Sequence, residues 1–249
     1  MKKKMQVLGV IPARYSSTRF PGKPLASIAG KPMIQHVYER AKKASTLNSV
    51  LVATDDERIL SCVESFGGSS IMTLKDHQTG TDRLAEVANF YPEFDVIVNI
   101  QGDEPLIDPE TIDMVVNALV SVANKDIVMA SAMTKISEKT ANDPNVVKVV
   151  TDNKNMALYF SRSKIPFLRG NENSVWQKHI GLYAYKYDFL LKYAKMESTY
   201  LENIEKLEQL RALENGYKIA MVDIENDISI GVDTPEDLKE AERLFKKLK

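Results

Sequence analysis

Residues 7–24 read V-L-G-V-I-P-A-R-Y-S-S-T-R-F-P-G-K-P. The run at 7–11 is apolar and of strand length, and it stops at Pro12. A loop rich in cations and hydroxyls follows it. From Met33 onward, apolar residues recur at three- and four-residue spacing, which is typical of one helix face. The stretch therefore opens a strand–loop–helix unit, the first half of a βαβ unit.

The same alternation continues through the first half of the chain. Strand-like apolar runs lie at 50–53, 71–72 and 96–100. Helical patterns lie between them, one ending at Gly67 and Gly68 and the next near Pro92, and a further helix begins at Asp108 and Pro109. Strands and helices that alternate at these lengths predict an α/β fold with a mostly parallel central sheet flanked by helices.

The second half of the chain is less regular. Residues 146–150, 157–160 and 180–185 have strand-like composition, and residues 201–215 and 236–247 have helical patterns. Gly216 can serve as the C-cap of the first of these helices. We expect a single domain over 1–249, in which residues 142–187 form a small strand-rich lobe.

Bulk composition narrows the class of protein. The 249 residues carry a net charge of −1, with 44% hydrophobic and 27% charged residues, as in ordinary soluble proteins. This balance disfavours nucleic acid and anionic membranes as partners. The single cysteine, Cys62, excludes an internal disulfide, and the apolar stretch after the N-terminal lysines is too short for a signal peptide. We expect a cytoplasmic protein.

The loop after the first predicted strand is a candidate phosphate site. Three cations, Arg14, Arg19 and Lys23, lie within ten residues, with Ser16 and other hydroxyls among them. Ligands of open parallel sheets bind at the carboxyl ends of strands, where this loop lies. The loop is not a Walker A motif. A solvated basic loop is the alternative, but its position and its closure by residues 21–24 favour binding of a triphosphate.

Two carboxylates are candidate Mg²⁺ ligands. Asp103 follows the apolar run 96–100 directly, and Asp233 lies in a similar segment far along the chain. Mg²⁺ in nucleotidyl transfer usually takes one or two carboxylates together with substrate phosphates. Alternatively, Asp103 stabilises its own turn, and Asp233 caps the helix that opens at Thr234. The three histidines are scattered and Cys62 stands alone, so no zinc site is expected.

Several motifs follow one another along nearly the whole chain. They are I-P-A-R-Y-S-S-T-R-F-P-G-K-P-L at 11–25, V-A-T-D-D at 52–56, H-Q-T-G-T-D-R at 77–83, N-I-Q-G-D-E-P at 99–105, Y-F-S-R at 159–162, H-I-G-L-Y at 179–183, L-E-Q-L-R at 207–211 and G-V-D-T-P-E-D-L at 231–238. Together they closely resemble the bacterial 3-deoxy-manno-octulosonate cytidylyltransferase family.

The resemblance implies a Rossmann-like nucleotidyltransferase fold, a homodimer, and a role in lipopolysaccharide biosynthesis. The implied reaction joins CTP to the eight-carbon acid sugar 3-deoxy-D-manno-octulosonate (Kdo), giving CMP-Kdo and pyrophosphate. Asp103 and Asp233 would hold Mg²⁺, and Arg14, Lys23 and Asp103 would be catalytic. The implied nucleotide-binding residues are Ala13, Arg14, Ser16, Lys23, Thr79, Gly80, Arg83 and Gln101. The implied sugar-binding residues are Arg162, His179, Tyr183, Glu208 and Gln209, within or beside the strand-rich lobe, which would also carry the dimer contacts. Cytosine selection would rest on backbone groups near Ala13 and on residues 78–83.

Other interpretations remain open at this point. The substrate could be the 8-amino analogue of Kdo, or the chain could be another sugar nucleotidyltransferase, for sialic acid or using UTP. A nucleotide-binding regulatory protein without catalysis is a further alternative, which the paired carboxylates and the sugar-site residues disfavour. His179 and Tyr183 could be packing residues of a strand, and Glu208 with Arg211 could be a surface ion pair.

Overall fold

The computed structural model describes residues 5–16, 20–77, 79–121, 126–170, 175–225, 227 and 229–247. Within the predicted loop and the 78–83 region, Ser17, Thr18, Arg19 and Gln78 lie outside the described residues. The chain forms two compact units. The first comprises Met1–Asp113 with Ile228–Lys249, and the second comprises Met114–Asp227. The expected lobe at 142–187 falls within the second unit.

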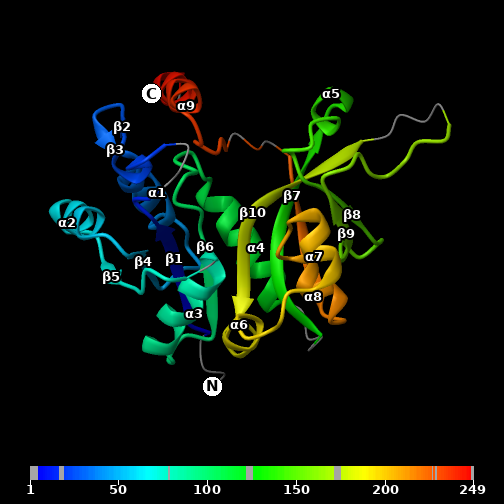
Figure 1. Ribbon diagram of the computed structural model, residues 1–249, viewed down its shortest axis with the longest axis horizontal. Coiled ribbons are helices and arrows are strands. Elements are labelled where there is room, and N and C mark those ends of the chain that lie inside the picture. The colour runs from blue at the N-terminus through cyan, green and yellow to red at the C-terminus, as the bar shows by residue number, and fades with distance from the viewer. Residues whose placement is uncertain are drawn as a thin grey trace. The chain divides into compact units, whose positions relative to one another are not determined.

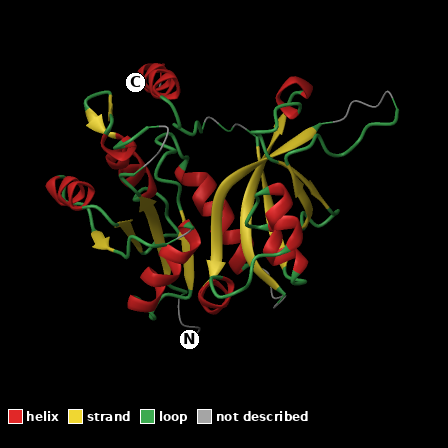
Figure 2. Ribbon diagram, viewed as in Figure 1, coloured by secondary structure: helices red, strands yellow, loops and turns green. Residues whose placement is uncertain are grey.

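The first unit is built on four parallel strands, drawn in yellow in Figure 2. They are β1 (Val7–Ala13), β4 (Ser49–Thr54), β5 (Ser70–Met72) and β6 (Val96–Asn99). Their order is β6-β1-β4-β5, with β1 in the middle paired in parallel with both β4 and β6. Almost every side chain of β1, β4 and β6 is buried, as expected for strands covered on both faces. The strands predicted from the apolar runs of the first half are confirmed.

Helices connect these strands. They are α1 (Met33–Ala41), α2 (Glu57–Ser65) and α3 (Gly80–Phe90). Asp56 caps α2 through the N–H of Arg58, and Thr79 and Asp82 form a capping box at the start of α3. Each cap lies in the loop after a strand, and this sets where the following helix begins.

Shorter elements complete the first unit. A 3-10 helix η1 (Lys23–Leu25) and a hairpin of β2 (Ser27–Ile28) and β3 (Lys31–Pro32) precede α1. The C-terminal helix α9 (Pro235–Lys247), red in Figure 1, buries Ala241 in a cluster with Ile28, Met33 and Val232. This packing anchors the segment that carries Asp233.

The second unit is strand-rich. It contains β7 (Ile127–Ile136), β8 (Lys148–Thr151), β9 (Ala157–Ser161), β10 (Trp176–Lys186) and β11 (Lys218–Ile224). β7 pairs in parallel with β11 and antiparallel with β10, and β8 pairs antiparallel with both β10 and β9. Its helices are α5 (Glu138–Ala141), α6 (Tyr187–Tyr193), α7 (Tyr200–Glu205) and α8 (Leu210–Glu214), and α4 (Pro109–Val120) runs from the first unit into the second.

The prediction of one helix over residues 201–215 was wrong. Two short helices, α7 and α8, occupy this stretch, and Lys206 between them has φ 54° and ψ 48°. A residue in this left-handed conformation cannot continue a right-handed helix, so α7 ends there. Gly216, with φ 79°, follows α8 at the position predicted for a C-cap.

Mostly parallel strands connected by helices, with a smaller set of antiparallel pairs in the second unit, confirm the predicted fold class. Among the described residues, we find no helix with both the length and the apolar character needed to cross a membrane.

Candidate active site

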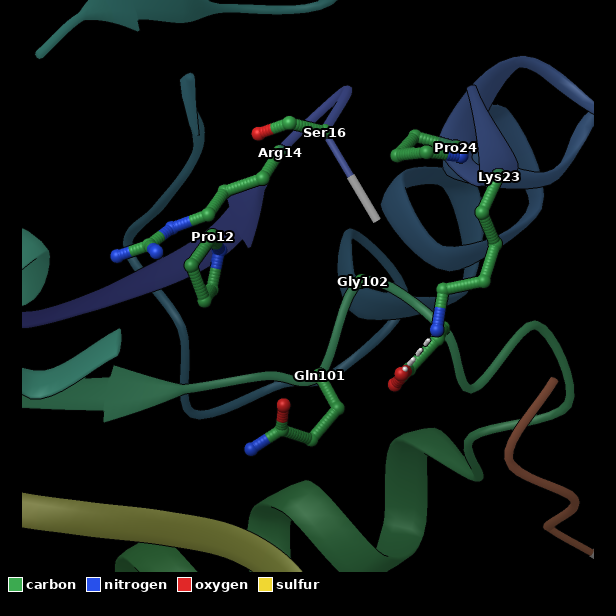
Figure 3. Close-up of a pocket in the computed structure, with 8 residues that line it drawn as sticks. Pro12, Arg14, Ser16, Lys23, Pro24, Gln101 and Gly102 are labelled. Carbon is green, nitrogen blue, oxygen red and sulfur yellow. Dashed lines mark hydrogen bonds and ion pairs between the residues drawn. The ribbon is translucent and has the colours of Figure 1, made fainter. Parts of the chain in front are cut away.

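A pocket of about 200 Å³ lies at the carboxyl ends of β1 and β6 in the first unit (Figure 3). Its position follows the rule for ligands of parallel sheets. Arg14 extends from the end of β1 on one side of the pocket, and Lys23 faces it from the other side. The lining residues are Pro12, Arg14, Ser16, Lys23, Pro24, Gln101, Gly102 and Asp103.

Gly102 allows the two strand ends to approach each other. A Cβ atom at this buried position would lie 2.7 Å from the carbonyl oxygen of Pro12, closer than real Cβ contacts occur. Only a residue without a side chain fits here. The segment after β6 can therefore place Gln101 and Asp103 beside the loop that follows β1.

Lys23 joins the two carboxylates predicted to bind metal. Its Nζ donates to Asp103 Oδ2 at 2.7 Å and to Asp233 Oδ1 at 3.1 Å. The first of these bonds is the dashed line in Figure 3. A backbone hydrogen bond from Val232 N to Asp103 O, 2.9 Å long, holds the two carboxylate-bearing loops together. Residues 103 and 233, which are 130 positions apart, thus converge on one cation.

Helix capping does not explain Asp233. The hydroxyl of Thr234 accepts from the N–H of Asp237, and the Asp237 carboxylate accepts from the N–H groups of Asp233 and Thr234. Thr234 and Asp237 therefore cap α9 reciprocally. The Asp233 carboxylate is turned toward Lys23, which excludes the capping alternative for this residue.

Arg14 ties the phosphate loop to the segment before α3. Its Nη2 donates to the carbonyl of His77 at 2.5 Å and to that of Thr79 at 3.4 Å. The His77 ring in turn contacts Glu86 of α3 at 2.5 Å. Thr79 and Gly80 do not line the pocket, but this contact places the start of α3 beside Arg14.

Arg83, predicted to bind the nucleotide, lies in the protein interior. It is fully buried, with Nη2 2.8 Å from Asp55 Oδ2 and Nη1 bonded to the hydroxyl of Thr73. Burial lowers the pKa of its guanidinium, and the charge of Asp55 opposes that shift. Neither Arg83 nor Ala13 lines the pocket, so their contacts with a nucleotide stay predictions. Asp55, which holds Arg83, directly follows the carboxyl end of β4 and was not predicted as a functional residue.

Two of the predicted sugar-binding residues meet on β10 in the second unit. The ring centroids of His179 and Tyr183 lie 5.3 Å apart, and Phe160 packs edge-on against His179 at 4.9 Å. Burial lowers the pKa of His179 to about 3 and, with the nearby charge of Glu208, raises that of Tyr183. Both groups are therefore neutral at physiological pH and can hydrogen bond without carrying charge.

Glu208 and Gln209 lie in the turn between α7 and α8. Gln209 is buried, and the backbone carbonyl of Glu208 accepts from the hydroxyl of Tyr193 at 2.5 Å. Arg211 is itself only 7% exposed and pairs with Glu202 through two hydrogen bonds, with Glu208 at 3.7 Å. The ion pair proposed as the alternative for Glu208 and Arg211 is therefore present, but it is mostly buried and does not lie on the surface.

Arg162 is held by backbone carbonyls. Its guanidinium donates to the carbonyls of Glu205 at 2.8 Å and Pro144 at 3.2 Å, and its own carbonyl accepts from the buried ammonium of Lys148 at 2.5 Å. These bonds fix the segment after β9 against the turn before α8. Its binding of a sugar carboxylate stays a prediction.

Comparison with known proteins places the chain in a family. Residues 8–219 match the family described as cytidylyltransferase. The 3-deoxy-manno-octulosonate cytidylyltransferase of Solibacter usitatus is 55% identical, over 97% of this chain and 95% of that protein. That of Geotalea uraniireducens is 52% identical, over 98% and 100%.

A solved structure agrees with the sequence comparison. The structure of CMP:2-keto-3-deoxy-manno-octonic acid synthetase complexed with CTP is 42% identical to this chain, with a TM-score of 0.93 and coverage of 98% of this chain and 100% of that one. With a full-length match in sequence and in fold, the chain belongs to the cytidylyltransferases and, among them, to the 3-deoxy-manno-octulosonate cytidylyltransferase family.

Proposed function

We propose that the chain transfers the cytidylyl group of CTP to Kdo in a Mg²⁺-dependent reaction. The anomeric hydroxyl of the sugar attacks the α-phosphorus in line, the bond to the bridging oxygen of the β-phosphate breaks, and pyrophosphate leaves. The hydroxyl proton passes to solvent. The convergence of Arg14, Lys23, Asp103 and Asp233 in and beside one pocket is the observation that carries this proposal.

The donor set fits Mg²⁺. Asp103 lines the pocket, and Lys23 links it to the second carboxylate, Asp233. Mg²⁺ characteristically takes one or two carboxylates and completes its shell with water and substrate phosphates. Here the ammonium of Lys23 already bridges both carboxylates, so the site accepts a cation between them. When bound to Asp103 and Asp233, the metal would neutralise phosphate charge and lower the pKa of the sugar hydroxyl.

The side chains of the pocket would bind and orient the triphosphate. Arg14 and Lys23 supply positive charge from opposite sides and would neutralise the charge that develops on the leaving pyrophosphate. With a triphosphate bound, phosphate oxygens become alternative partners for Lys23. Gln101, which follows β6, would lie beside the nucleotide, and Ser16 would add a hydroxyl donor.

The second unit would bind the acceptor. Kdo carries one carboxylate, which matches the guanidinium of Arg162. It also carries several hydroxyls, which match side chains that can donate or accept hydrogen bonds. The residues proposed for the hydroxyls are His179, Tyr183, Glu208 and Gln209. The rings of His179 and Tyr183 are in contact, and Glu208 is close enough for its charge to raise the pKa of Tyr183. Both observations support a shared site.

A homodimer and a cytoplasmic location are part of the proposal, the location because CTP is supplied there. The second unit exposes large apolar side chains, among them Leu158 at 61%, Tyr200 at 73% and Ile204 at 65%. Tyr200 and Ile204 are four residues apart on α7 and share one face. Exposed apolar groups of this kind support a protein contact. Light scattering should give a dimer, and the I204E variant should weaken it while L74E, an equally exposed change in the first unit, should not.

Pyrophosphate release tests the reaction. The full-length chain is assayed with CTP or UTP against Kdo, 8-amino-Kdo and sialic acid, with Mg²⁺ or with excess EDTA. We expect release with CTP, Kdo and Mg²⁺ together, loss of release in EDTA, and recovery on adding Mg²⁺. Release only with UTP or only with sialic acid would overturn the proposal, and full activity in EDTA would remove the metal from it.

A further inference from the structure

β10 is irregular within the motif that carries His179 and Tyr183. Ile180 and Tyr183 pair with adjacent residues of β7, the second of them Ser131, so β10 contains two extra residues at this point. Such a bulge interrupts the ladder of backbone hydrogen bonds and leaves carbonyl groups that need other donors. The side chain opposite the bulge therefore affects the shape of the motif.

Ser131 fills the bulge. The residue is fully buried, and its Oγ has three partners within hydrogen-bonding distance. The carbonyl oxygen of Ile180 lies at 3.0 Å, that of Leu182 at 2.8 Å, and Nε2 of His179 at 2.9 Å. One hydroxyl thus connects both carbonyls of the bulge with the ring of a proposed sugar-binding residue.

The number of protons available in this cluster determines which nitrogen of the His179 ring is protonated. A serine hydroxyl has one proton and two acceptor lone pairs, and carbonyl oxygens only accept. If the hydroxyl donated to His179, both carbonyls would face the serine oxygen without a proton between them. Donation to one carbonyl reduces these two contacts to one and leaves Ser131 to accept from the ring.

We infer that Ser131 is a positioning residue, which accepts a hydrogen bond from Nε2–H of His179 and thereby keeps Nδ1 as an unprotonated acceptor. The ring then presents an acceptor to a ligand hydroxyl, as a polyhydroxy acid would supply. The inference rests on the proposed function only in this last step, the pairing of Nδ1 with the sugar.

The surroundings of the ring support a neutral imidazole. Phe160 and Tyr183 pack against it, and no carboxylate is recorded among its hydrogen-bonding partners in the described part of the chain. Burial and the charge of Lys178 both lower the pKa of His179, to about 3. Ser131 therefore selects between two neutral tautomers at the pH of any assay.

Nitrogen NMR of the histidine rings tests the tautomer directly. The chain has three histidines, and His36 provides an internal reference because its Nε2 lies 2.7 Å from the carbonyl of Ile28 and must be protonated. In the full-length wild-type protein at neutral pH, His179 should show protonated Nε2 and unprotonated Nδ1. A protonated Nδ1 would overturn the inference, whatever the behaviour of any variant.

The S131A variant tests the consequence for binding. The matched control is T134V, which removes another buried β7 hydroxyl bonded to a carbonyl, that of Ile224 at 2.7 Å. S131A should mix the His179 tautomers and raise KM for Kdo about five- to tenfold, with KM for CTP changed less than about twofold. T134V should leave both KM values and the tautomer unchanged.

The outcomes separate this inference from the proposed function. An S131A variant with an unchanged tautomer and unchanged KM for Kdo overturns the inference, and so does an equal rise of both KM values in S131A and T134V. If wild type shows the expected tautomer but does not turn over Kdo, the proposed function fails while the positioning by Ser131 stands.

Discussion

Ion pairs hold the candidate site of the first unit together, whereas the proposed site of the second unit consists of buried side chains and hydrogen bonds to backbone carbonyls. Lys23, Asp103 and Asp233 are partly exposed, with side-chain exposures of 13%, 32% and 45%. In contrast, His179 is 8% and Gln209 5% exposed. The first arrangement suits an anionic substrate with a metal, and the second suits a neutral, shape-dependent contact with sugar hydroxyls.

This difference predicts which kinetic constant changes when a residue of either unit is substituted. A charge removed from the first unit should affect the chemical step, because phosphate charge is stabilised there. A polar group removed from the second unit should affect KM for the sugar, because one hydrogen bond contributes about 1 kcal/mol. The variants that follow would break or sharpen this contrast.

The largest effect is expected for D103N. Loss of one of two carboxylates should lower kcat roughly 10³-fold, since Asp233 alone would bind the metal more weakly and would not fix its position. Thermal unfolding should change little, because Asp103 is partly exposed. Pyrophosphate release and a melting curve measure the two quantities.

The matched control for D103N is D113N, which removes a charge from the same unit away from the pocket. Asp113 accepts from Ser45 and Thr46, so this variant should lose stability but keep kcat. Near-normal turnover of D103N would contradict the metal assignment.

G102A should lower kcat/KM about 100-fold. The added methyl would force the segment after β6 away from Pro12, and a displacement on the order of 1 Å costs about this factor. Steady-state kinetics with CTP and Kdo give the value. The control is G170A, where an added Cβ meets nothing within 4 Å, and its kinetics should equal wild type. Equal effects of both variants would refute the close packing at Gly102.

His179 should make stability depend on pH. Its folded pKa of about 3 lies below the value of about 6.5 in the unfolded chain, which therefore binds more protons between these values. The free energy of unfolding should then fall as pH falls below 6.5, with a contribution from His179 of about 2 kcal/mol at pH 5. Denaturant unfolding at pH 7.5 and pH 5 should show a smaller loss for H179Q than for wild type. An equal loss in both proteins would place a charged or accessible imidazole at this position.

The smallest effect is expected for Y183F. Removal of the hydroxyl leaves the ring contacts with His179 in place, so KM for Kdo should rise about five- to tenfold and KM for CTP should stay the same. The control, Y217F, removes a hydroxyl in the same unit that bonds to Lys192. If Y183F raised KM for CTP instead, the division of the two substrates between the units would be wrong.

The sequence predicted the first unit better than the second. The apolar runs there are followed by helices, and α2 and α3 begin at side-chain caps, so local pattern and final structure agree. The long strands β7 and β11 were missed, although β7 is almost entirely buried and β11 largely so. Alanine and methionine interrupt both strands, so they lack the β-branched apolar run that marked β1, β4 and β6.

Residue roles differed in the same way. Asp103 could be predicted from its place after a strand, and Asp233 from its motif. The structure brings both together at Lys23. The burial of Arg83 against Asp55 could not be predicted, because its partner lies 28 residues away and no local pattern links them. The bulge that Ser131 fills is likewise a property of pairing between distant strands.

The linkage formed in the product tests the central claim most directly. Kdo labelled with ¹³C at the anomeric carbon is incubated with the chain, CTP and Mg²⁺, and the product is observed by ³¹P and ¹³C NMR. We expect coupling between the labelled carbon and the phosphorus of CMP, with one pyrophosphate released for each sugar consumed. Free CMP without this coupling, or phosphorus joined to another sugar oxygen, would contradict transfer to the anomeric hydroxyl.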